Sequence, residues 1–149
     1  MLREIDIPPL WLAIFALVLW GMDRALPGLA TGWEWLGPVG FGLVVLGLAI
    51  MGLAVIEFLR NNTTFVPRRV PTAFLQNGIY KFSRNPIYLG DALVLAGLAV
   101  KWDMLPGLVL VPAFMALIAR RYIVGEEAGL EAKFGAEFTA WKQRVRRWL

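Results

Sequence analysis

The sequence contains no cysteine and no histidine. The absence of cysteine excludes disulfides, thiolate nucleophiles and metal sites built on cysteine. The absence of histidine removes the commonest transition-metal ligand and the side chain that most often acts as a general base at neutral pH. Charged residues are also scarce, at 17% of 149 residues, whereas a soluble domain carries about 25%. Chemistry in this chain therefore depends on carboxylates, arginines, a few lysines and tyrosines, and backbone groups.

Apolar residues are abundant instead, at 58% of the chain against about 45–50% in soluble domains. They are concentrated in four runs, and a chain of this length predicts a single domain, 1–149. Only the second run approaches the roughly 20 residues needed to cross a bilayer, so the other spans would rely on flanking residues, local thinning or snorkelling. We expect an all-α membrane protein with four transmembrane helices, at about 7–26, 38–59, 86–100 and 104–123.

The first run is not typical of a signal peptide, because the residues before it are net negative and Pro8-Pro9 stand at its start. Twelve of the fifteen lysines and arginines fall between residues 60 and 86 or after residue 119. The positive-inside rule then predicts that both termini and the loop 60–85 face the cytoplasm. This membrane-facing bias explains the basic balance, so we expect no nucleic-acid partner.

The loop 60–85 is too long for a simple connection, and its apolar and aromatic content argues against disorder. Pro67 and Pro71 block a continuous helix, and Asn77-Gly78 predicts a turn. Asn85 and Pro86 fit the N-cap and first position of the third helix. We therefore interpret this loop as an ordered, functional segment.

The C-terminal residues 126–148 predict an amphipathic helix that lies at the membrane interface or caps the bundle. Its apolar positions recur every three or four residues and form one stripe, Leu130, Phe134, Phe138, Trp141, Val145 and Trp148.

Small residues at a spacing of seven, Gly40, Gly47 and Ala54, lie on one face of the second span. They would allow close approach of a neighbouring helix, or they reflect the general glycine enrichment of membrane helices.

Two motifs together resemble a known family. Gly78–Gly90 contains Gly-Ile-Tyr followed by Arg-Asn-Pro-Ile-Tyr-Leu-Gly, and Glu126–Phe138 contains Glu-Glu-Ala-Gly-Leu followed by Phe-Gly-Ala-Glu-Phe. These are similar to the signatures of the isoprenylcysteine carboxyl methyltransferase family, and phosphatidylethanolamine N-methyltransferases share a looser form of both. The resemblance covers about residues 67–149. In this sequence Asn85 replaces the family's histidine, and Tyr122 with Arg121 beside it stands where the family has a substrate-binding arginine.

The resemblance implies an integral-membrane methyltransferase that uses S-adenosylmethionine and releases S-adenosylhomocysteine. The residues implied at the cofactor are Thr72, Ala73, Phe74, Leu75, Gly78, Tyr80, Arg84, Asn85, Pro86, Ile87, Tyr88 and Glu126. Arg121 and Tyr122 would face the substrate. No metal is required, because methyl transfer is an in-line displacement that needs alignment and exclusion of water.

The chemistry of these residues fits that donor. Glu126 could pair with its ammonium group, Arg84 could bind its carboxylate, and aromatic rings could contact adenine or the sulfonium. The adjacent carboxylates Glu126 and Glu127 could equally mark an exposed helix start. An amine acceptor must lose a proton, and the local candidates are Glu127, Asp91 and a tyrosine, with Tyr88 the tyrosine we expect in the catalytic site. Asp91 is a functional candidate because it is ionisable within a span, although a solvated structural role also fits.

We therefore expect methyl transfer to a hydrophobic or lipid-like acceptor at the cytoplasmic face, with membrane lipids as partners. The alternatives are phospholipid N-methylation and a non-catalytic membrane scaffold. The short length and Asn85 indicate a bacterial protein, and hence the bacterial inner membrane. The acceptor and the oligomeric state do not follow from the sequence.

Overall fold

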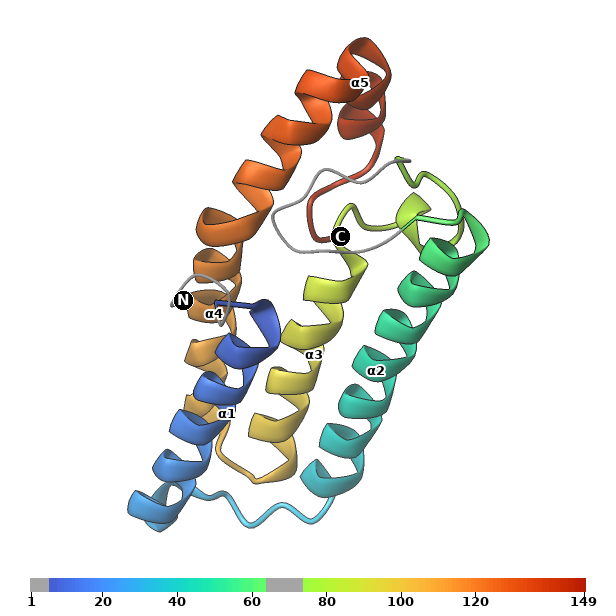
Figure 1. Cartoon of the computed structure of the whole chain (residues 1–149). Coiled ribbons are helices and arrows are strands. Elements are labelled where there is room, and N and C mark those ends of the chain that lie inside the picture. The colour runs from blue at the N-terminus through green and yellow to red at the C-terminus, as the bar shows by residue number, and fades with distance from the viewer. Residues whose placement is uncertain (1–5, 64–73) are drawn as a thin grey trace.

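The structure, a computed structural model, describes residues 6–63 and 74–149 (Figure 1). Every regular element in these residues is helical, which confirms the expected all-α fold class. The long helices are α1 (Pro8–Ala25), α2 (Leu36–Arg60), α3 (Pro86–Lys101), α4 (Leu110–Ile118) and α5 (Val124–Arg144). Short helical turns are η1 (Pro27–Leu29), η2 (Gly78–Lys81), η3 (Leu105–Val109) and the π-helical turn η4 (Ala119–Ile123).

Two helices in the described residues are long and apolar enough to cross a membrane, namely α2 and the 40-residue helix Leu105–Arg144. The helices α1 and α3 have 18 and 16 residues. At a rise of about 1.5 Å per residue they extend about 27 and 24 Å, slightly less than a hydrocarbon core of about 30 Å. The helices at the first and third predicted spans are thus short, as the apolar runs in the sequence indicated.

The C-terminal helix differs from the single helix expected over 126–148. It continues from α4 through η4 into α5 without a break, as the orange ribbon in Figure 1 shows. Gly135, at φ 52° and ψ −123°, then folds α5 back on itself, and the helix ends at Arg144. These dihedral angles suit glycine and are strained for residues with a Cβ, so the reversal falls at this position.

Helices α2 and α3 pack closely through glycine. Gly40 and Gly47 on α2 are buried, and a Cβ placed at Gly47 would lie 2.6 Å from the carbonyl oxygen of Gly90. A Cβ at Gly97 would lie 2.8 Å from the carbonyl oxygen of Gly40. The face predicted from the seven-residue spacing is therefore a helix contact, and glycine is needed there because the two backbones nearly touch.

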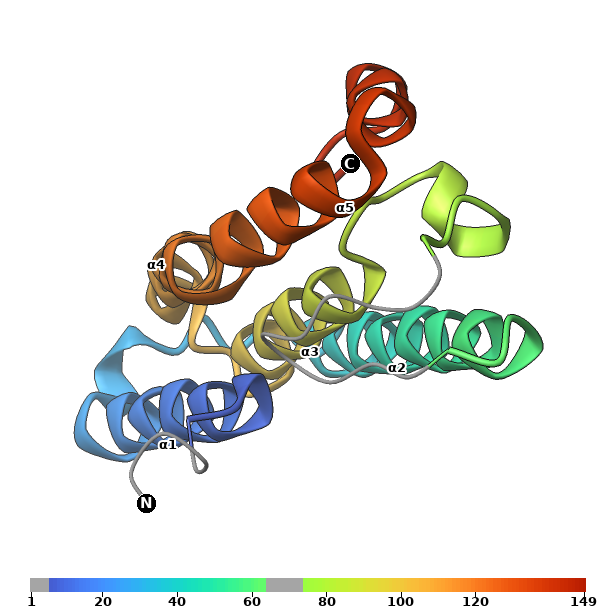
Figure 2. The same ribbon diagram turned by 45° about the horizontal axis from the view of Figure 1, so that its top comes forward.

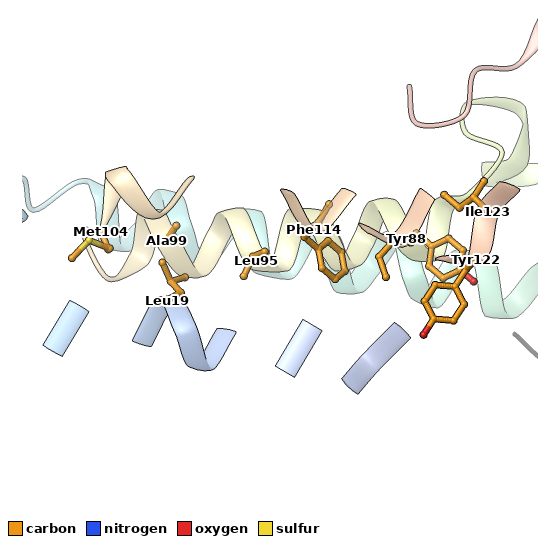
Figure 3. Close-up of a cluster of buried hydrophobic side chains, with 10 residues drawn as sticks. Leu19, Tyr88, Leu95, Ala99, Met104, Phe114, Tyr122 and Ile123 are labelled. Carbon is orange, nitrogen blue, oxygen red and sulfur yellow. The ribbon is translucent and has the colours of Figure 1, made fainter. Parts of the chain in front are cut away.

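The main core lies where α1, α3 and the α4–α5 helix meet. Figure 3 shows its buried side chains arranged along α3, from Met104 at one end to Tyr88, Tyr122 and Ile123 at the other. The aromatic end of this core positions the site described below.

A second cluster covers the end of the bundle that carries both motifs. It joins the end of α2, the η2 turn and the folded-back part of α5. Its buried members are Ala54, Phe58, Leu75, Tyr80, Phe138, Trp141 and Val145. The apolar stripe predicted in the C-terminal segment thus packs mainly inside the protein, and its last member, Trp148, contacts the main core.

The chain after α5 returns to the start of α3. Figure 2 shows the C-terminus inside the bend of α5, next to the segment that leads into α3. The backbone N–H of Arg84 donates to the carbonyl oxygen of Arg146 at 3.0 Å. This contact places the two sequence motifs and the C-terminus at one end of the bundle.

Candidate active site

A direct hydrogen bond joins the two motifs. The Tyr88 hydroxyl, in the first turn of α3, donates to Glu126 Oε1, in the first turn of α5, at 2.9 Å. Tyr88 is 2% exposed, and its ring centroid lies 6.3 Å from that of Tyr122. Tyr88 and Tyr122 both belong to the packed aromatic end of the main core, and Glu126 follows Tyr122 about one turn later on the continuous helix.

Beside this pair, Glu127 lies between two arginines. Arg147 Nη2 donates to Glu127 Oε2 at 2.7 Å and Arg147 Nε to Oε1 at 3.1 Å. Arg84 Nη1 lies 3.0 Å from Glu127 Oε1, as an ion pair without hydrogen-bond alignment. The hydrogen bond to Glu127 raises the pKa of Arg147. Burial lowers the pKa of Arg84, although the Glu127 charge opposes that change.

Arg84 has unused hydrogen-bonding capacity. Its side chain is only 10% exposed, and its Nε and Nη1 atoms form no hydrogen bond with any residue that the structure describes. Buried donors are normally satisfied, so an anionic group bound here would complete the arrangement.

Asn85 occupies the N-cap position of α3 and Pro86 the first helical position, as expected, but the Asn85 side chain does not cap the helix. Its Nδ2 instead donates to the carbonyl oxygen of Arg147 at 3.0 Å. The amide expected at the cofactor therefore holds the C-terminal segment against α3.

Tyr80 lies in η2, is 7% exposed and meets the ring of Phe58 edge-on at 6.0 Å. Burial raises the pKa of Tyr80, and the charges of Glu126 and Glu57 raise it further. The Glu57 carboxylate packs on Gly78, where a Cβ would lie 2.7 Å from its Cδ. Glu57, 8% exposed, thus supports the turn that carries Tyr80.

The remaining predicted cofactor residues are distributed differently. Phe74 packs against the folded-back part of α5, with its ring 4.8 Å from that of Trp141, and Leu75 is buried in the same cluster. Ile87 is half-buried and contacts both clusters. Thr72 and Ala73 lie outside the described residues.

Asp91 lies on α3 one turn after Tyr88 and is 2% exposed. It has neither a hydrogen bond nor an ion pair within 6–63 and 74–149. An ionisable side chain held at 2% exposure inside the bundle is unusual, which makes Asp91 a candidate for interaction with a ligand.

Arg121 and Tyr122, the predicted substrate residues, both bind Asp6. Arg121 Nη2 lies 2.6 Å from Asp6 Oδ2, and the Tyr122 hydroxyl donates to Asp6 Oδ1 at 2.6 Å. Sequence reasoning missed Asp6 and Arg147, because no local spacing connects either to partners 20 to 116 residues away.

Across the described part of the chain, no three acidic side chains gather as a metal site would require.

The profile of the phospholipid methyltransferase family matches residues 36–137. The chain belongs to this family. An uncharacterised protein of Haemophilus influenzae is 35% identical over 63 residues, which cover 42% of this chain and 79% of that protein.

The fold of this phospholipid methyltransferase family member is similar to that of isoprenylcysteine carboxyl methyltransferase, a eukaryotic intramembrane Ras methyltransferase. The TM-score is 0.72 at 21% sequence identity, and the match covers 93% of this chain. This chain spans about half the length of that structure, 50% of it being covered. The family match and the similar fold together support a membrane methyltransferase.

Proposed function

We propose that the chain transfers a methyl group from S-adenosylmethionine to a hydrophobic, lipid-like acceptor at the cytoplasmic face of the membrane. The hydrogen bond between Tyr88 and Glu126 carries this proposal, because it brings the two sequence motifs into one site. The product of the donor would be S-adenosylhomocysteine.

The charges around this bond fit such a donor. The Glu126 carboxylate would bind its ammonium group, and Arg84, whose Nε and Nη1 are buried without a hydrogen bond, would bind its carboxylate. The buried ring of Tyr80 and that of Tyr88 would contact its cationic or aromatic parts. S-adenosylmethionine supplies the electrophilic methyl group when bound.

Other motif residues would shape the donor site through packing and backbone groups. Asn85 contributes indirectly, because it fixes the C-terminal segment that brings Arg147 to Glu127. The remaining residues assigned to this role are Thr72, Ala73, Phe74, Leu75, Gly78, Pro86 and Ile87.

Three side chains would serve the transfer itself. Tyr88 would orient Glu126 through their hydrogen bond, and Glu127 would position Arg84. Asp91, buried and without a partner in the described residues, would accept the proton that an amine acceptor loses, at a carboxylate oxygen. We therefore assign proton transfer to Asp91, because Glu127 is occupied by two arginines.

Phospholipid N-methylation is the more specific reading that the family match favours. A lipid amine would have to enter the bundle beside Tyr88 to meet Asp91, because Asp91 is 2% exposed. Many apolar side chains on α2 are exposed, which supports contact of this helix with lipid.

The test is methyl transfer by purified protein in vesicles that contain phosphatidylethanolamine, with a radiolabelled methyl donor. We expect label in the lipid extract, and at least about a tenfold loss in Glu126→Gln, because a charged hydrogen bond is removed. Glu131→Gln is the matched control, since Glu131 lies on the same helix, is itself exposed and, among the described residues, pairs with Lys142 and Thr139. Equal rates in the two variants, or no transfer by folded wild type, would contradict the proposal and favour a scaffold.

A further inference from the structure

A single carboxylate, Asp6, collects the donors of three side chains. Trp11 Nε1 donates to its Oδ1 at 2.8 Å, and Tyr122 donates to the same oxygen at 2.6 Å. Arg121 Nε lies 2.9 and 2.8 Å from the two oxygens, and its guanidinium stacks 5.2 Å from the Trp11 ring centroid. Trp11, Arg121 and Tyr122 thus form a converging set of donors whose geometry suits a carboxylate.

This donor set lies next to the candidate active site. Tyr122 stands between Asp6 and Tyr88, because its hydroxyl contacts the first while its ring lies 6.3 Å from the ring of the second. Tyr88 in turn binds Glu126. The ring of Tyr122 therefore separates the Asp6 carboxylate from Tyr88 and Glu126, the pair to which we assign the methyl donor S-adenosylmethionine.

The donor set is also open on one side. The Asp6 side chain is 12% exposed, whereas that of Arg121 is 46% exposed. A shallow groove of about 420 Å³ runs along α4 to Arg121 and is lined by Ala113, Ala116, Leu117, Arg120 and Arg121. Alanine and leucine side chains line the groove together with the two arginines, a combination that suits an alkyl chain whose anionic end reaches Arg121.

We propose that Trp11, Arg121 and Tyr122 form a carboxylate-binding subsite and that Asp6, by occupying it, is a specificity-determining residue. An acceptor with a carboxylate at this point would meet like charge in the same place, which is strongly unfavourable. Acceptors without a carboxylate there are not penalised. This inference rests on the proposed function, because it concerns which acceptors reach the same site.

A purely structural role makes a different prediction. If Asp6 only fastened the start of α1 to η4, its removal would leave a small closed cavity. That cavity would bind acetate as well as any longer carboxylate. A subsite that continues into the groove on α4 prefers a carboxylate with an alkyl chain, so chain length separates the two roles.

The experiment measures the thermal unfolding of the detergent-purified protein with sodium acetate and with sodium octanoate below its micelle-forming concentration. We expect octanoate to raise the Tm of Asp6→Ala, with an affinity at least about tenfold higher than for wild type. Acetate should have a weaker effect, and octylammonium none. Asp23→Ala, at the other end of α1, is the matched control and should behave as wild type.

Asp6→Asn keeps the size of the side chain and serves if Asp6→Ala does not fold; it should show the same order of ligands. Adding Arg121→Ala should abolish the octanoate response. An equal response to acetate and octanoate, or no response in a folded variant, would overturn the proposal. S-adenosylhomocysteine binding, measured on the same samples, keeps the two proposals apart. Retained binding without an octanoate response overturns only the role of Asp6. Absent binding in wild type overturns the proposed function and the role of Asp6 in choosing acceptors, and the octanoate response then tests the carboxylate-binding subsite by itself.

Discussion

The contact between α2 and α3 predicts that Gly47→Ala destabilises the protein, although alanine is the better helix former. The added Cβ would lie 2.6 Å from the carbonyl oxygen of Gly90 and 3.1 Å from the backbone nitrogen of Val94. Carbon–oxygen contacts between helices are normally about 3.3–3.6 Å. Neither backbone atom can rotate away, so the helices would have to separate by close to an ångström.

The cost follows from two opposing effects. Overpacking of this kind costs about 1–3 kcal/mol, and the better helix propensity of alanine returns up to about 1 kcal/mol. We expect a net loss of about 1–2 kcal/mol in the free energy of unfolding. For a chain of this size that corresponds to a fall in Tm of about 2–8 °C.

The assay is thermal unfolding in detergent micelles, followed by tryptophan fluorescence. Gly52→Ala on the same helix is the matched control, because no atom lies within 4 Å of its added Cβ. Gly52→Ala should leave the Tm unchanged or raise it slightly. If both variants changed the Tm equally, the close approach of α2 and α3 would be refuted.

Three further predictions concern the end of the bundle that carries the motifs. Glu127→Gln should lower the free energy of unfolding by about 3 kcal/mol, because it leaves buried positive charge unpaired. Arg147→Ala should lower it less, since the Arg147 side chain is 36% exposed, and chemical denaturation of both variants checks which loss is larger. Burial raises the pKa of Tyr80, so the folded state disfavours the ionised tyrosine. The full stability is therefore present below about pH 10 and is lost as the pH rises further, and Tyr80→Phe should flatten this alkaline fall in Tm. Gly135→Ala should cost about 1–3 kcal/mol through backbone strain at φ 52°, whereas Gly125→Ala should not; circular dichroism melts compare the two.

The sequence was sufficient to predict the helical class, and it indicated a face of small residues on α2 that could contact another helix. Apolar runs report burial in lipid or protein directly, and the seven-residue spacing of Gly40 and Gly47 places them on one face. The start of α3 was also predictable, because proline is favoured at the first position of a helix, where Pro86 lies. These features depend on residues close together in the chain.

The features that the sequence did not predict depend on long-range contacts. The reversal at Gly135 has no local signal beyond a glycine inside a periodic pattern, and such glycines often continue a helix. The contact of Asp6 with Tyr122 spans 116 residues. The Asn85 side chain does not cap α3 but donates a hydrogen bond to the carbonyl oxygen of the distant Arg147. Motif resemblance placed Tyr88 and Glu126 in one site, and the structure adds the hydrogen bond between them.

A calorimetric titration of the detergent-purified protein with S-adenosylhomocysteine determines whether the pair Tyr88 and Glu126 marks the methyl-donor site. The wild type should bind saturably, and Glu126→Gln should bind at least about tenfold more weakly, because the partner of the ligand's ammonium group loses its charge. Glu131→Gln should bind as wild type does. Unchanged binding in Glu126→Gln would place the methyl donor elsewhere, and no binding by folded wild type would contradict the account of this site.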